Sequence, residues 1–285
     1  MPTKESIKKE WDFSKNMAEI LEVMKQLAQT QFAASKKVCA SSFGGLIVSF
    51  DPVFEALMTL PESDVFIKND IPDIGIVVTT SDQSFMGALN SKIVKGAKAV
   101  APHNPCMYLV TGRKGTLKFR FNGDPHIGFP PIKEGPPIAA LSREMTEYVI
   151  RQFRERKLGK LYVASAFSTS FTNQTIRATQ LLPFSDLIKE PDEVQKRLLR
   201  GRIVQEAESK TLGEYTARLW VYNSLFYLFQ NNKPAEYAAL ATQMEASHDS
   251  VKKVIGKLQI AYKRARNEKI DQGMREIFVS SMVAG

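Results

Sequence analysis

Two long segments without proline, one at each end of the chain, most constrain how this sequence can fold. The first, residues 4–42, contains neither proline nor glycine. From about Ser6 to about Lys37 its apolar and small residues recur at steps of three and four, the pattern of one face of a long amphipathic helix. The positions on this face are Ile7, Trp11, Ser14, Met17, Ile20, Met24, Leu27, Gln31 and Ala34. We therefore expect one long N-terminal helix.

The second segment, from Ala235 to Met282, has a spacing close to a heptad repeat. Its repeating positions are Leu240, Met244, Ser247, Val251, Val254, Leu258, Ala261 and Ala265. A helix of about 45 residues would be about 70 Å long, which exceeds the thickness of an ordinary domain. The simplest way to bury its apolar face is against the N-terminal helix, in an antiparallel coiled coil. The alternative is that each helix packs separately onto the rest of the protein.

Between these segments the pattern predicts a Rossmann-like α/β domain inserted between the two helices. We expect strands at Ile74–Thr80, Met107–Thr111, Leu161–Ser165 and Ile176–Pro183, and helices at Leu89–Val100 and Leu141–Arg156. The proline-rich piece Gly123–Pro137 is expected to be a loop, and Asn231–Pro234 to break or kink a helix. The predicted domains are residues 1–60, 61–192 and 193–285.

The composition is that of a globular protein, with 44% hydrophobic and 24% charged residues among 285. No run of about 18 apolar residues predicts a membrane-spanning helix; the longest candidate is Phe43–Phe50. The charged N-terminus does not resemble a secretory signal. Two cysteines, Cys39 and Cys106, form neither a disulfide framework nor a metal motif, so a reducing compartment is expected.

The net charge of +9 favours a partner with an acidic surface, which includes nucleic acid, anionic lipid and protein. Lysine and arginine outnumber aspartate and glutamate between residues 249 and 276, on the predicted C-terminal helix. Only Tyr262 and Phe278 could stack on bases there, whereas binders of single-stranded nucleic acid interleave aromatic and basic residues. An acidic protein collar around the helix fits at least as well.

No catalytic, cofactor or metal motif emerges from the sequence. Ser84–Asn90 follows a predicted strand but carries one glycine, whereas a dinucleotide fingerprint needs three. Gly112–Thr116 resembles a phosphate loop in composition but not in spacing. His103, His126 and His248 are far apart and do not form a cluster. We expect no catalytic residues, no metal and no cofactor.

Three segments, taken in order, carry a more specific pattern. The first runs from Ile7 through Ala28, and the second is Val78–Asn90, Val-Thr-Thr-Ser-Asp-Gln-Ser-Phe-Met-Gly-Ala-Leu-Asn. The third begins Leu-Gln-Ile-Ala-Tyr-Lys-Arg-Ala-Arg at Leu258 and continues to Ile277. Together they resemble the gamma subunit of F-type ATP synthases. The chain departs from the family at Gln83, Ser84, Met86 and Ala88, where Arg, Gly, Cys and Gly are usual, and is therefore identified as a divergent member.

The resemblance implies contacts with a catalytic hexamer on both terminal helices. Met24 and Lys25 match the region that bears on the catalytic subunits, and Arg266 matches an arginine that engages a loop of the hexamer. At three of the implied positions, Gln31, Asn267 and Asp271, this chain carries a different side chain from the family. The full set of expected hexamer contacts is Met24, Lys25, Gln31, Arg266, Asn267, Ile270, Asp271, Gln272 and Glu276.

The resemblance further implies a non-catalytic rotor shaft that couples proton or sodium flow to ATP synthesis or hydrolysis. Its expected partners are the catalytic and non-catalytic nucleotide-binding subunits, the epsilon subunit and the membrane rotor ring, with no nucleic acid. The expected location is peripheral, on the cytoplasmic face of the bacterial inner membrane. The alternatives are a nucleotide-binding α/β enzyme with helical arms and a basic coiled-coil nucleic-acid binder.

Overall fold

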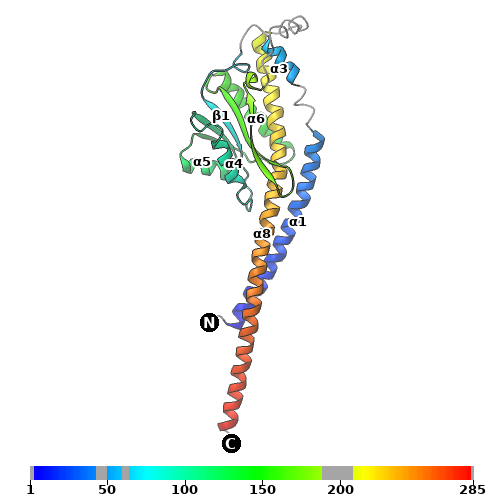
Figure 1. Ribbon diagram of the computed structural model, residues 1–285, viewed down its shortest axis with the longest axis vertical. Helices are drawn as coiled ribbons and strands as arrows, with labels where there is room; N and C mark the ends of the chain where they lie inside the picture. Colours follow the sequence, from blue (N-terminus) through cyan, green and yellow to red (C-terminus); the bar gives the residue numbers. More distant parts are fainter. Residues whose placement is uncertain (1–2, 43–49, 60–63, 188–207, 284–285) are drawn as a thin grey trace. The chain divides into compact units, whose positions relative to one another are not determined.

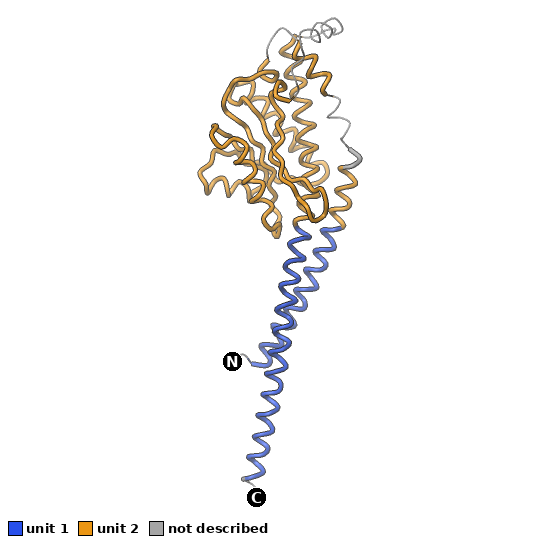
Figure 2. Tube along the Cα trace, viewed as in Figure 1, with its two compact units in different colours: residues 1–29, 240–285 blue, residues 30–239 orange. Residues whose placement is uncertain are grey.

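The computed structural model describes residues 3–42, 50–59, 64–187 and 208–283. The chain divides into two compact units (Figure 2), one formed by residues 1–29 with 240–285 and the other by residues 30–239. The smaller unit thus combines the first and last parts of the sequence. Most of the apolar run Phe43–Phe50 and the predicted boundaries at residues 60 and 193 lie outside the described residues.

The larger unit contains a five-stranded sheet with the strand order β3-β2-β1-β4-β5. Its strands are β1 (Ile74–Thr79), β2 (Cys106–Thr111), β3 (His126–Phe129), β4 (Lys160–Ser168) and β5 (Gln174–Leu182). The first four are parallel, with Ile76 opposite both Tyr108 and Tyr162, and β5 runs antiparallel to β4. Every residue of β1 is buried, as predicted for a central strand covered on both faces.

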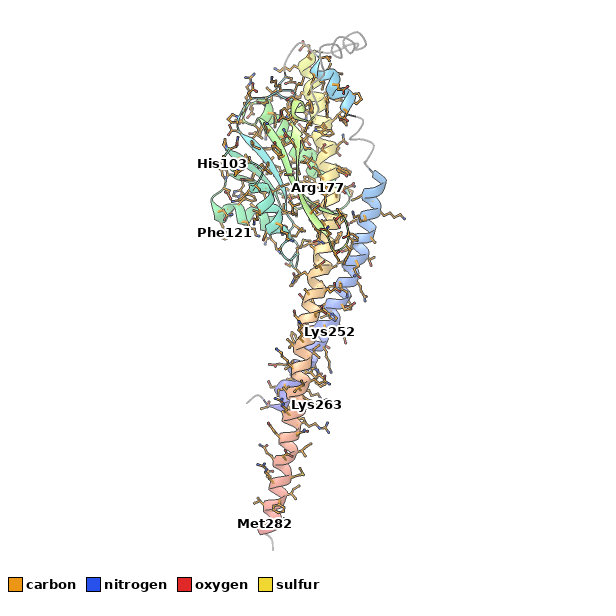
Figure 3. The ribbon with its side chains drawn as sticks, in the orientation of Figure 1. His103, Phe121, Arg177, Lys252, Lys263 and Met282 are labelled. Carbon is orange, nitrogen blue, oxygen red and sulfur yellow. The ribbon has the colours of Figure 1, made fainter. Side chains whose placement is uncertain are left out.

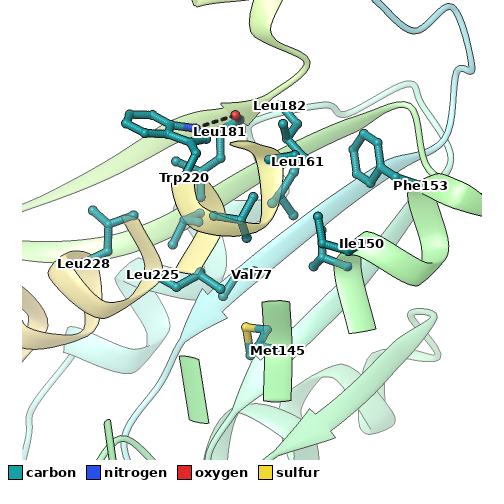
Figure 4. Packing of buried hydrophobic residues seen from close by; sticks show 14 of the residues in the cluster. Val77, Met145, Ile150, Phe153, Leu161, Leu181, Leu182, Trp220, Leu225 and Leu228 are labelled. Carbon is teal, nitrogen blue, oxygen red and sulfur yellow. Dashed lines mark hydrogen bonds between the residues drawn. The ribbon is translucent and has the colours of Figure 1, made fainter. Parts of the chain in front are cut away.

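Helices cover both faces of this sheet (Figure 1), which confirms the predicted α/β domain. On one face α4 (Leu89–Lys98) and α5 (Arg113–Asn122) pack against Ile76 and Val78. On the other face Val77 belongs to a core that includes α6 (Pro136–Arg154), α3 (Asp51–Met58) and the first part of α8 (Ser209–Val283). In that core (Figure 4) Trp220 Nε1 donates a hydrogen bond to the Leu181 carbonyl oxygen at 2.9 Å. The single-turn η1 (Phe184–Asp186) follows β5.

The prediction that Gly123–Pro137 is a loop is wrong at two places. Strand β3 occupies the four residues between Pro125 and Pro130, and it lies at the edge of the sheet, where flanking prolines interrupt no ladder. Helix α6 begins at Pro136, because proline is compatible with the first turn of a helix. Helix α5 was not predicted; it is capped at its C-terminal end by Gly123 in the left-handed conformation.

Asn231–Pro234 was predicted to break or kink a helix, and the break is wrong, because α8 continues through Pro234 as one helix of 75 residues. Proline removes the hydrogen bond that the carbonyl of residue 230 would otherwise accept within the helix. That carbonyl, on Gln230, instead accepts a hydrogen bond from Cys39 Sγ of α1 (Lys4–Ser42) at 3.5 Å. A tertiary contact thus satisfies the polar group that proline leaves free.

The smaller unit contains parts of α1 and α8 that contact each other at several points. The rings of Trp11 and Tyr262 lie 5.6 Å apart, and Glu22 Oε2 lies 3.8 Å from His248 Nδ1. Trp11 comes before Glu22 in α1, whereas its partner Tyr262 comes after His248 in α8. The two segments therefore run in opposite directions. Figure 2 shows the last part of α8 extending beyond the first residues of α1.

Within the smaller unit, the residues that are buried or half-buried recur along each helix at alternating steps of four and three. On α1 they include Ile7, Trp11, Ser14, Ala18, Leu21, Lys25 and Ala28; on α8, Met244, His248, Val251, Ile255, Leu258, Tyr262 and Ala265. The predicted inward face is therefore wrong at Ile20 and Leu27, which are 55% and 56% exposed, and at Val254, which is 46% exposed. Ala18 and Ala28 are buried instead. With a period of 3.5 residues, the position of a residue along the helix determines whether it faces inward, whatever the size of its side chain.

Candidate functional site

A stripe of exposed apolar side chains follows the outer side of α1. Phe13, Ile20 and Leu27 are spaced seven residues apart, and Val23 lies between the last two. Each is more than half exposed. Single exposed apolar residues are ordinary, but a contiguous apolar surface marks an interaction site. This α1 stripe is therefore a candidate for contact with another molecule.

The end of α8 is a second apolar surface. From Arg266 to Met282 every residue is exposed except Gly273, which is intermediate. Six large apolar residues lie on this segment, which we call the α8 tip: Ile270, Met274, Ile277, Phe278, Val279 and Met282. Met282, labelled in Figure 3, projects near the end of the helix. Burial of these side chains requires a partner, since a free apolar surface of this kind is unfavourable in water.

The charges of the smaller unit divide between paired and exposed groups. Lys25 Nζ lies 3.1 Å from Glu22 Oε2. The hydrogen bond from Lys25 lowers the pKa of Glu22, and the charges of Lys25 and His248 act in the same direction. In contrast, Lys252 and Lys263 are exposed on α8 (Figure 3). The unit thus presents cations around an apolar surface.

The structure places most of the expected hexamer contacts in the smaller unit. Met24 and Lys25 are half-buried on α1, whereas the six expected residues of α8 are exposed: Arg266, Asn267, Ile270, Asp271, Gln272 and Glu276. Gln31 belongs to the larger unit and lines a hollow there together with Ser35 and Glu134. Gln31 is thus the one expected contact that belongs to the larger unit.

Phe13 and Val23 of the α1 stripe were not predicted from the sequence, and Ile20 and Leu27 were expected on the inward face. The seven-residue spacing of Phe13, Ile20 and Leu27 was the available signal. Two interleaved apolar faces on one helix are hard to separate by periodicity, because both repeat every three or four residues.

The loop that resembles a phosphate-binding site is occupied by a side chain of the protein itself. Gly112, with a φ of +80°, immediately precedes α5, whose first backbone N–H groups have no partner within the helix, as in an anion site. Asp82 Oδ1 accepts hydrogen bonds from the backbone N–H of Arg113 and, at 3.4 Å, of Lys114. A carboxylate of the chain thus uses the donors that a phosphate would need.

The cysteines offer little nucleophilic character, because burial raises the pKa of both Cys39 and Cys106. Within the described ranges, His, Cys, Asp and Glu form no group of three suited to a metal ion. No helix among the same residues combines the length and apolar character needed to cross a bilayer.

Comparisons with known proteins give a consistent match. A family model described as ATP synthase matches residues 3–284. The ATP synthase gamma chains of Streptococcus pyogenes strains NZ131 and Manfredo are each 26% identical to this chain over 226 residues. Each alignment covers 76% of this chain and 75% of the relative. Neither the nucleotide-binding enzyme nor the nucleic-acid binder is supported by these matches.

Solved structures agree in fold. The rotor of the Euglena gracilis mitochondrial ATP synthase matches with a TM-score of 0.67 at 13% identity, covering 94% of this chain and 98% of that one. The central stalk and c-ring structure of the Tetrahymena thermophila enzyme matches with a TM-score of 0.57 at 18% identity, covering 80% and 99%. At this identity the likeness concerns the fold, whereas the family model spans nearly the whole sequence. The chain therefore belongs to the gamma-subunit family of ATP synthases, whose members are non-catalytic central-stalk subunits.

Proposed function

We propose that this protein is the central rotor shaft of an F-type ATP synthase or ATPase and performs no chemistry itself. The observation that carries this conclusion is the smaller unit, in which the two ends of the chain combine and leave the α8 tip apolar and exposed. Such a tip is suited to insertion into a ring of other subunits. The coupling ion is a proton or sodium.

We also propose that the terminal helices form an antiparallel coiled coil. Support comes from the contacts of Trp11 with Tyr262 and of Glu22 with His248. The alternating steps of four and three residues in both segments give the 3.5-residue period of such a pair. The small side chains of Ala18 and Ala28 permit close approach of the two backbones. In terms of sequence, the proposed parts remain residues 1–60, 61–192 and 193–285.

The proposed partners follow from this assignment. Catalytic and non-catalytic nucleotide-binding subunits surround the shaft, while the epsilon subunit and the membrane ring contact the α/β domain. One of the similar Euglena structures is described as containing F1 and a c-ring; it matches with a TM-score of 0.69 at 15% identity. The protein is then a peripheral component of a membrane-bound complex, on the cytoplasmic face.

The shaft acts by touching the catalytic subunits unequally. A ligand shifts a conformational equilibrium only through a difference in its free energy of binding to the two states. A shaft that pressed identically on each catalytic subunit would leave their nucleotide affinities equal. One side of α1 carries the apolar stripe, while the cations and apolar residues of α8 lie elsewhere on the unit, so successive orientations present different surfaces to each subunit.

The assignment is tested by reconstitution. The purified chain alone should hydrolyse no ATP, whereas a hexamer of nucleotide-binding subunits that contains it should rotate it during hydrolysis. Rotation is measured with a bead attached to the α/β domain. ATP turnover by the chain without partners, or rotation-free hydrolysis in the assembled complex, would refute the rotor assignment.

Arg266→Ala should weaken coupling by roughly tenfold, because a charged hydrogen bond contributes about 1.5–3 kcal/mol. Arg266 is exposed on α8 and free to reach a partner loop. The measurement is ATP-driven ion pumping by the complex in vesicles, relative to ATP hydrolysis. Arg264→Ala is the matched control, since it removes the same exposed charge from the same helix at a position outside both the expected contacts and the α8 tip. Equal effects of both variants would contradict the role of Arg266.

A further inference from the structure

We infer that three buried polar residues of α8, Asn232, Lys233 and Glu236, form a joint that fixes the rotation of α8 relative to the sheet. We call this set the polar joint. The inference rests on the proposed rotor function, because the purpose of the joint is to carry torque from the α/β domain into the long helix. All three residues and their partners belong to the larger compact unit.

Asn232 attaches α8 to two strands. It is fully buried, and its Oδ1 accepts hydrogen bonds from Thr79 Oγ1 at 3.0 Å and from the backbone N–H of Ala166 at 3.1 Å. Its Nδ2 donates to Glu236 Oε1 at 2.8 Å. One side chain therefore contacts the end of β1, the second half of β4 and the next turn of α8.

Lys233 and Glu236 extend this attachment to a further segment. Lys233 Nζ donates to the Ile132 carbonyl oxygen at 3.1 Å and to Glu236 Oε2 at 2.6 Å. The two side chains are only 6% and 1% exposed. Burial raises the pKa of Glu236, and the charge of Lys233 opposes this effect. The joint thus holds two ionisable side chains in contact where water is excluded.

Hydrogen bonds to fixed backbone atoms restrict the rotation of a helix in a way that apolar packing does not. Apolar attraction is non-directional, so a helix can turn slightly about its axis with little loss of buried area. Hydrogen bonds weaken steeply with misalignment. Ala166 N and Ile132 O lie on different segments, so rotation of α8 in either direction strains at least one bond.

The cost of the joint argues that it does more than stabilise the fold. Replacement of a buried ion pair by apolar residues of similar volume is often neutral or even stabilising. Burial of Lys233 and Glu236 is therefore a poor means of gaining stability. A role in fixing the orientation of α8 explains why charges lie there.

The end of α1 also makes hydrogen bonds near the polar joint, both to α8 and to the sheet. Cys39 bonds the carbonyl of Gln230, which Pro234 leaves free, and Ser35 Oγ donates to Glu134 Oε1. Lys36 Nζ donates to the carbonyl oxygen of Ser168 at the end of β4. Within the larger unit, both long helices thus make hydrogen bonds with neighbouring segments near Pro234. The residues of the polar joint are the most buried among those that make these bonds.

The test is the torsional stiffness of the rotor in the assembled complex. With the hexamer stalled, the angular variance of a bead on the α/β domain reports how freely that domain turns relative to the held shaft. The double variant Lys233→Met/Glu236→Leu should at least double this variance. Its matched control is Lys157→Met/Glu155→Leu, which removes an exposed ion pair of 2.7 Å from the same domain and should leave the variance unchanged.

A second variant keeps the proposal falsifiable if the double variant fails to assemble. Thr79→Val removes a hydroxyl that lies 3.0 Å from Asn232 Oδ1 and 3.1 Å from the carbonyl oxygen of Ala164. It changes neither charge nor volume appreciably, and it should increase the variance in the same direction. If the angular variance of the bead is unchanged in the assembled variants, the proposed role of the joint is wrong. The same conclusion holds if the variants melt at a lower temperature while the angular variance is unchanged. If the wild-type complex does not rotate under ATP, the rotor function fails instead, which separates the two outcomes.

Discussion

Replacing Ile277 and Phe278 together with serine should weaken binding of the chain to the catalytic hexamer by at least about 100-fold. The two side chains are 70% and 62% exposed in the free chain. Burying one large apolar side chain contributes about 1.5–3 kcal/mol, so loss of two removes about 3 kcal/mol or more. A difference of 1.4 kcal/mol corresponds to a tenfold change in affinity. The measurement is titration of labelled chain with hexamer.

Phe121→Ser supplies the control for this prediction. Phe121 is 85% exposed, but it lies on α5 in the other compact unit. Its replacement should leave the affinity for the hexamer unchanged. If both variants lose affinity equally, the α8 tip is not the inserted surface. The same conclusion follows if the double variant binds the hexamer with full affinity.

Phe153→Ala should lower the free energy of unfolding of the α/β domain by about 3–5 kcal/mol, the usual cost of truncating a buried phenylalanine. Phe153 is fully buried on α6 and stacks on Phe66 with the ring centroids 5.9 Å apart. Its neighbours in the core, among them Ile150 and Leu161, cannot collapse completely into the space that would be left (Figure 4). Urea unfolding followed by circular dichroism measures the change.

The exposed counterpart distinguishes core packing from a general effect of losing an aromatic ring. Phe121→Ala should change the free energy of unfolding by no more than about 0.5 kcal/mol, as for most surface substitutions. A loss of less than about 1 kcal/mol for Phe153→Ala would show that the core repacks around the missing ring.

The sequence predicted the central part of the sheet well, because fully buried strands have a strong local pattern. Ile74–Thr80 is continuously apolar or β-branched, and β1 occupies all of it except Thr80. The edge strand β3 was missed, since four residues between two prolines bury little and carry no periodic signal. The short α5 was missed for a related reason, because Arg113–Asn122 is mostly polar and gains its helical state by covering the sheet.

The candidate site was predicted in part. The family resemblance gave residues on both terminal helices, and those on α8 are exposed and free to meet a partner. The α1 stripe was not predicted, because Ile20 and Leu27 fit an inward face equally well by spacing. The polar joint was not predicted either, since its three residues are polar in a sequence region expected to break a helix.

The sequence by itself determined that both ends of the chain are long helices flanking an α/β domain, because period and the absence of proline are local properties. Only the tertiary structure decided which residues of α1 face inward, since that choice depends on how closely α8 approaches. It buried Ala28 and exposed Leu27. It also decided that α8 passes through Pro234, because a hydrogen bond from another helix satisfies the carbonyl that proline leaves free.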